Sequence, residues 1–95
     1  MRLVTLAVSS LSPTVGAVRT NAALVLAEAR AMADAGVSLG AFPEQVLGGY
    51  PPEDLVQWRA FLDAQRRALD AFAAATADLP TVFVLGLALP VDALP

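Results

Sequence analysis

Ninety-five residues with a mass of 9.8 kDa form one small domain, and this length excludes a second domain of full size. The chain is 57% hydrophobic, but 20 residues are alanines, and the longest uncharged run of bulky residues, between Asp78 and Asp92, is shorter than the roughly 18 apolar residues of a membrane span. A net charge of -3 with no basic cluster beyond Arg66-Arg67 argues against a nucleic-acid partner.

The first expected element is a strand over residues 3–8. Leu3 to Val8 is a nearly continuous aliphatic and β-branched run, which is typical of a strand covered on both faces, and Ser9-Ser10 ends it. Together with Met1-Arg2 this run has the order of a secretory signal. Its six residues fall short of the apolar run of about 7 to 15 that such a signal needs, so we expect a cytoplasmic protein.

The first helix is predicted over residues 21–35. Thr20 or Asn21 stands where an amino-terminal cap is expected, and Gly36 stands where the helix should end. At about 100° per residue, six side chains gather on one side, which we expect to be buried: Ala22, Val25, Leu26, Ala29, Met32 and Ala33. The alanines on the remaining side permit a second close contact.

A short second strand is predicted over residues 37–42, although Gly40 is a poor residue for a strand interior. Pro43 ends it, because proline cannot donate to a strand ladder. Residues 44–54 then predict a loop, since Gly48-Gly49 and Pro51-Pro52 follow in close succession. The acidic pair at the end of this loop, Glu53-Asp54, suits the start of the next helix, where the helix dipole is positive.

A second helix is predicted over residues 55–77, and it carries the strongest periodic signal in the chain. Its apolar residues recur at spacings of three and four, which predicts that they belong to the core: Trp58, Phe61, Leu62, Leu69 and Phe72. Its outer side carries opposite charges four residues apart, which is typical of a solvated face: Arg59 with Asp63, Asp63 with Arg67, and Arg66 with Asp70.

Residues 81–89 predict a third buried strand, broken only by Gly86. The order strand, helix, strand, helix, strand defines the α/β class, with strands joined by right-handed crossovers. No helix follows the last strand to cover its outer face. Ligands of open α/β sheets bind beyond the carboxyl ends of the strands, so we expect a site among residues 9–18, residues 43–54 and the chain from Pro90 onward.

The residue types that the chain lacks exclude most enzyme chemistry within it. Without Cys there is no disulfide, thiolate zinc site or thiol nucleophile, and without His there is no imidazole proton shuttle. Without Lys no lysine-based mechanism can operate. We expect neither a metal site nor a cofactor of its own in these 95 residues.

Glu44 is the residue whose position suggests a catalytic role. It follows directly after the second predicted strand, where backbone and packing can hold a carboxylate still. The loop after it is rigid at its prolines and can approach a ligand at its glycines. On this pattern alone a solvated charge is the simpler interpretation of Glu44, and Tyr50 either contacts a ligand or covers the edge of the core.

Three motifs carry a resemblance to a known family. Residues 42–44 read Phe-Pro-Glu after a strand, and residues 49–55 read Gly-Tyr-Pro-Pro-Glu-Asp-Leu. The first resembles the whole carbon–nitrogen hydrolase (nitrilase) superfamily, and the second resembles its glutamine-dependent NAD synthetase branch more narrowly. Residues 12–16, Asn21 and residues 61–66 fit the same branch. The similarity runs from Leu3 to about Leu89.

This resemblance implies an αββα sandwich built from two associated subunits, hence a homo-oligomer. It also implies a Glu, Lys and Cys trio that hydrolyses glutamine, the small-molecule substrate, through a covalent thioester. By resemblance Glu44 is the general base of the trio, and Tyr50 lines the glutamine pocket. The released ammonia would serve a carboxyl-terminal synthetase domain that uses ATP and magnesium to amidate nicotinic acid adenine dinucleotide to NAD.

Only part of that family pattern maps onto the chain. The Lys and the Cys lie downstream of the matched region, and the synthetase domain is absent, so residues 1–95 are interpreted as the amino-terminal portion of the glutaminase domain and as inactive alone. One alternative is a non-catalytic remnant or interaction module that associates through exposed apolar surface. Another is the start of a different amidase of the superfamily, which residues 49–55 disfavour.

Overall fold

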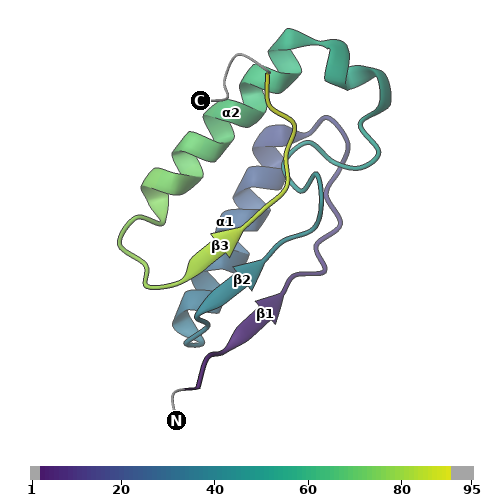
Figure 1. The fold of residues 1–95 in the computed structure, drawn as a ribbon. Coiled ribbons are helices and arrows are strands. Elements are labelled where there is room, and N and C mark those ends of the chain that lie inside the picture. Colours follow the sequence, from purple (N-terminus) through teal and green to yellow (C-terminus); the bar gives the residue numbers. More distant parts are fainter. Residues whose placement is uncertain (1–2, 91–95) are drawn as a thin grey trace.

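Three parallel strands alternate with two long helices in the computed structural model, which describes residues 3–90 (Figure 1). The elements are β1 (Leu6–Val8), α1 (Val18–Asp34), β2 (Leu39–Ala41), the 3-10 helix η1 (Glu53–Gln57), α2 (Arg59–Ala75) and β3 (Val82–Val84). The predicted α/β class and the predicted order of strands and helices are therefore confirmed. Part of the third candidate loop, beyond Pro90, lies outside the described residues.

The sheet has the strand order β1-β2-β3, with all neighbours parallel. Each strand is three residues long, which is shorter than predicted. Backbone hydrogen bonds nevertheless continue past the strand ends. The amide of Ser9 donates to the carbonyl of Ala41 at 2.8 Å, and the amide of Val46 donates to the carbonyl of Gly86 at 3.0 Å.

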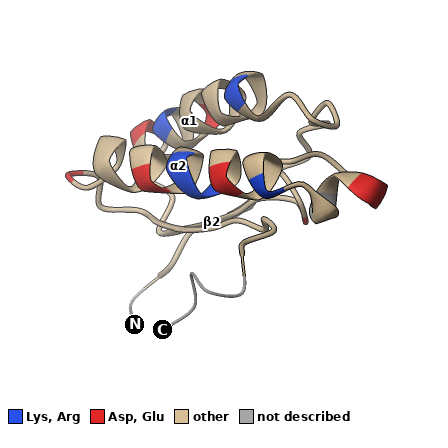
Figure 2. Cartoon of the chain, turned by 90° about the horizontal axis from the view of Figure 1, so that it is seen from above, with Lys and Arg blue, Asp and Glu red and all other residues tan. Residues whose placement is uncertain are grey.

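Both helices cover the same face of the sheet, because two successive crossovers in the same direction place them on one side (Figure 2). The central row of the sheet, Ala7, Gly40 and Phe83, belongs to this covered face. The packing of α1 against this face explains why residue 40 is glycine. A Cβ atom there would lie 2.5 Å from the sulfur of Met32, so the glycine leaves room for that side chain to pack on the sheet.

The opposite face of the sheet is open among the described residues, and we call it the open sheet face. It consists of two apolar rows, Leu6, Leu39 and Val82 in one and Val8, Ala41 and Val84 in the other. The prediction that the first strand is covered on both faces is thus wrong, and the burial predicted for the third strand is wrong at Val82 and Val84. Figure 2 shows the charged residues on the helices and loops, with none on the strands.

The core lies between the sheet and the helices. Its buried side chains come from α1, from the segment around β2 and from α2: Val25, Ala29, Met32, Val37, Phe42, Val46, Leu47 and Phe72. The ring of Phe83 packs against two others, with centroids 5.6 Å from Phe72 and 6.3 Å from Phe42. The predicted buried side of the first helix is confirmed at Val25, Ala29 and Met32. None of the helices among residues 3–90 is long and apolar enough to cross a membrane.

The start of α1 differs from its prediction. The helix begins at Val18, its capping position is Ala17, and no side chain caps it. Neither Thr20 nor Asn21 is therefore the cap. Asn21 instead lies inside the first turn and is 1% exposed, because its polar side chain has partners in two loops.

The second helix is interrupted at Trp58, whose backbone is extended (φ -96°, ψ 114°) and separates η1 from α2. Its side chain is 65% exposed, so the prediction that Trp58 belongs to the core is wrong. Phe61 and Phe72 are buried as predicted, and Gln65, 0% exposed, occupies the same face. The helical period is correct, but it begins one residue after the tryptophan.

The charged face of α2 is solvated, as predicted. Arg59 and Asp63 form an ion pair at 3.0 Å, and Arg66 and Asp70 form one at 3.3 Å. The predicted pair of Asp63 with Arg67 does not form in the described structure. Arg67 lines a groove between α1 and α2 instead.

Candidate functional site

A groove of about 340 Å³ lies at the carboxyl end of the sheet, where an α/β fold is expected to bind ligands. One wall comes from the loop after β1 and contains Leu11, Ser12 and Pro13. The other comes from the loop after β2 and contains Pro43, Glu44 and Tyr50. Glu44 and Tyr50, the two residues singled out from the sequence, therefore line the same groove.

The backbone of Glu44 is held from the side of β3. Phe42 donates its amide to the carbonyl of Val84 at 2.8 Å, and the amide of Val46 reaches the carbonyl of Gly86. A Cβ atom on Gly86 would lie 3.1 Å from the Cα atom of Glu44, so the close approach of these two segments leaves little room for a side chain. The carboxylate itself is exposed and lines the groove.

The Tyr50 side of the groove is shaped by a tight turn. The amide of Gly49 donates to the carbonyl of Gln45 at 2.7 Å, and Gln45 has a left-handed backbone (φ 56°). Gly49 also has a positive φ, and a Cβ atom there would lie 2.4 Å from the Cα atom of Val15. Tyr50, which precedes a cis proline, is 65% exposed and lines the groove, so it does not cover the edge of the core.

The wall formed by the first loop is also anchored. The hydroxyl of Ser9 donates to a carboxylate oxygen of Glu28 at 2.9 Å and accepts the amide of Leu11 at 3.1 Å. Further along, the amide of Gly16 donates to the carbonyl of Gly48 at 2.9 Å, which joins the two loops. Both walls are thus fixed by hydrogen bonds to neighbouring elements.

The groove offers a small set of polar groups. The carboxylate of Glu44 can accept a proton or a hydrogen bond, and the hydroxyls of Ser12 and Tyr50 can both donate and accept. Among the residues that the structure describes, no three acidic side chains gather in a way that could hold a metal ion. The geometry therefore supports acid–base chemistry carried by a single carboxylate.

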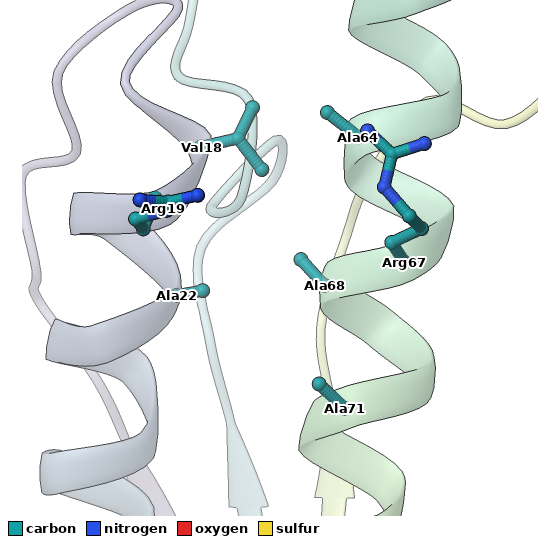
Figure 3. Close-up of a pocket in the computed structure, with 7 residues that line it drawn as sticks. All are labelled: Val18, Arg19, Ala22, Ala64, Arg67, Ala68 and Ala71. Atoms are coloured by element: carbon teal, nitrogen blue, oxygen red, sulfur yellow. The ribbon is translucent and has the colours of Figure 1, made fainter.

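A second groove, of about 320 Å³, lies between α1 and α2 (Figure 3). Alanines from both helices line most of it: Ala22 from α1 and Ala64, Ala68 and Ala71 from α2. Arg19 and Arg67 are the two charged residues at this groove, one from each helix. It contains no carboxylate, so the candidate for catalysis remains the groove of Glu44.

Sequence reasoning misses how the two walls are joined. The sequence predicts Thr20 or Asn21 as a cap and Gly49 as a place where the loop can approach a ligand, whereas Asn21 and Gly49 make contacts that hold one loop against the other. It also misses the buried polar Gln65. A polar residue within an otherwise apolar helix face is the available signal for Asn21 and Gln65.

The fold and the groove thus define an α/β protein with a single-carboxylate site at the carboxyl edge of its sheet. Comparison with known proteins narrows this class. The chain is 35% identical over 86 residues to the glutamine-dependent NAD(+) synthetase of Thermotoga maritima, 44% over 73 residues to that of Mycobacterium bovis, and 41% over 78 residues to that of Rhodobacter capsulatus. No protein-family model matches the chain.

These matches cover 90%, 77% and 82% of this chain, but only 15%, 11% and 14% of the respective relatives. The chain is therefore a distant homologue of a portion of the glutamine-dependent NAD(+) synthetases.

Proposed function

We propose that the chain forms the opening part of a glutaminase domain in a glutamine-dependent NAD synthetase, with Glu44 as general base. The observation that carries this proposal is the shared groove of Glu44 and Tyr50 at the carboxyl edge of the sheet, in a chain homologous to those enzymes. A general base must lie within reach of the proton that it takes, and an exposed carboxylate on a fixed backbone meets this need.

In the proposed reaction Glu44 takes the proton of a thiol as the sulfur attacks the side-chain amide carbon of glutamine. Glu44 passes this proton to the leaving nitrogen, so that ammonia departs and a thioester forms. The carboxylate, ionised again, then takes a proton from the water that hydrolyses the thioester to glutamate, and returns it to the departing sulfur. Tyr50 would line the glutamine side of the groove. The thiol and the lysine would come from parts of the synthetase outside the matched region, because this chain contains neither residue type. The ATP- and magnesium-dependent amidation belongs to the synthetase domain.

A chimera tests this proposal directly. Residues 3–89 replace the homologous segment of the Thermotoga maritima relative, and NAD formation is measured with glutamine and, separately, with ammonium as nitrogen donor. We expect both donors to support NAD formation. A companion protein that lacks the segment should use ammonium alone. If the chimera, too, uses ammonium but not glutamine, the proposed role of this chain is wrong.

The open sheet face favours a second candidate, in which the chain is a non-catalytic module that pairs with a second copy of itself. Its two apolar rows carry no charge, so two identical faces can meet without like-charge repulsion. Val82 is 62% exposed at one edge of this face.

Val82→Lys is expected to abolish such pairing, because it would place an ammonium group in the apolar contact. Sedimentation velocity over a range of concentrations should show a dimer for the natural chain and a monomer for the variant. Leu24→Lys, at an exposed apolar position on α1, is the matched control and should leave the dimer intact. A natural chain that is monomeric at every concentration would rule out this candidate.

A further inference from the structure

We infer that Asn21 is a positioning residue that fixes the spacing between the two walls of the groove. Its side chain is 1% exposed and projects from α1 between the loop after β1 and the loop after β2. Its consequence for catalysis rests on the proposed function, whereas its mechanical role can be measured in the chain itself.

Three hydrogen bonds join Asn21 to both loops. Its oxygen accepts the amide of Thr14 at 2.9 Å, and its nitrogen donates to the carbonyl of Thr14 at 2.8 Å. The same nitrogen donates to the carbonyl of Leu47 at 2.9 Å. Both amide protons are thus used, one toward each loop, and the bond to Leu47 is buried.

These partners lie next to the residues that line the groove. Thr14 follows Pro13 in one wall, and Leu47 stands three residues after Glu44 in the other. Asn21 belongs to a helix of 17 residues, so it offers both loops a rigid point of attachment. The walls should therefore keep a constant separation while Asn21 holds both of them.

Neither aspartate nor alanine can replace these contacts. Aspartate has the same shape but lacks the two donors that the carbonyls of Thr14 and Leu47 require. Alanine would leave those carbonyls and the amide of Thr14 without their partner, in a place that water does not easily reach. A shortened side chain should thus loosen the walls more than it disturbs the strands.

Hydrogen exchange in the full 95-residue chain tests this role. The readout is the protection of the Gly16 amide, which bonds to the opposite loop, divided by that of the Phe42 amide, which bonds to β3. In Asn21→Ala this ratio should fall by roughly tenfold or more, because the joined loops open without general unfolding. An unchanged ratio overturns the inference.

Thr81→Val is the matched control. It removes another buried side-chain hydrogen bond, from the hydroxyl of Thr81 to the carbonyl of Val37 at 2.7 Å, at the opposite end of the sheet. This variant should leave the ratio unchanged. If Asn21→Ala does not fold, the inference can be tested in the unsubstituted chain. The two side-chain amide protons of Asn21 should then give separate, slowly exchanging signals. Fast-exchanging signals would overturn the inference.

The chimeric synthetase separates this inference from the proposed function. With glutamine, Asn21→Ala should lower kcat about tenfold or more and leave the rate with ammonium unchanged, since a small displacement of a catalytic group is costly. Thr81→Val should leave both rates unchanged. If the unsubstituted chimera does not use glutamine, the proposed function fails, while a lowered exchange ratio still supports the role of Asn21. If kcat falls but the exchange ratio is unchanged, Asn21 does not fix the spacing between the two walls.

Discussion

Replacing Glu44 by glutamine is expected to lower the glutamine-dependent rate of the chimeric synthetase by about 10³-fold or more. Glutamine has almost the same size and keeps a carbonyl oxygen at the groove, but it cannot accept a proton near neutral pH. Both proton transfers of the proposed reaction would therefore lose their base. The initial rate of glutamate release is the direct measurement, with NAD formation from ammonium measured in parallel.

The rate with ammonium should stay unchanged in Glu44→Gln, because that reaction bypasses the groove. Glu53→Gln is the matched control, since Glu53 is another exposed carboxylate but lies in η1 and does not line the groove. Its glutamine-dependent rate should equal that of the unsubstituted chimera. Equal losses in the two variants, or no loss in Glu44→Gln, would contradict the assignment of Glu44 as the base.

Gly49→Ala is expected to lower the free energy of unfolding by about 3 kcal/mol or more. Two penalties combine at this position. The backbone has a φ of +88°, and the new methyl group would meet backbone atoms of Val15 and Thr14 at distances of 2.4 to 2.9 Å. No change of side-chain rotamer relieves a contact with backbone, so one loop must move away from the other.

Gly36→Ala separates these two penalties. Gly36 has a similar φ of +80°, but no atom lies within 4 Å of the place that its new methyl group would take, so only the conformational penalty of about 1 to 2 kcal/mol applies. Urea unfolding of both variants, followed by circular dichroism, gives the comparison. Equal destabilisation by the two substitutions would show that the close approach of the loops at Gly49 adds no penalty of its own.

The order of strands and helices could be predicted because it depends on local patterns. Apolar runs around Ala7 and Phe83 and the helical period through Phe61 and Phe72 appear directly in the sequence. Which faces of the strands are covered depends instead on the direction of both crossovers, so the open sheet face was not predictable from a continuous apolar run. The spacing of Trp58 predicts a place on the helix face, but its extended backbone interrupts the helix there.

The candidate site, like the fold, could be predicted from the sequence only in part. Glu44 can be singled out because it directly follows a predicted strand, and Tyr50 because it belongs to the motif of residues 49–55 that carries the family resemblance. The opposite wall could not be assigned from sequence, because the contact of Gly49 with Val15 joins residues 34 positions apart. Asn21 is predicted as a possible cap because asparagine near a helix start is commonly one, whereas its burial shows that it contacts the two loops instead.

The contacts between the two loops have a further consequence for how the groove arises during folding. The bond of Gly16 to Gly48 and that of Asn21 to Leu47 close long stretches of chain, which include most of α1 and the whole of β2. Contacts of such high sequence separation generally form late, after the local elements exist. The groove is therefore a product of the complete tertiary structure, and a synthetic peptide of residues 43–54 would contain Glu44 and Tyr50 but not the site.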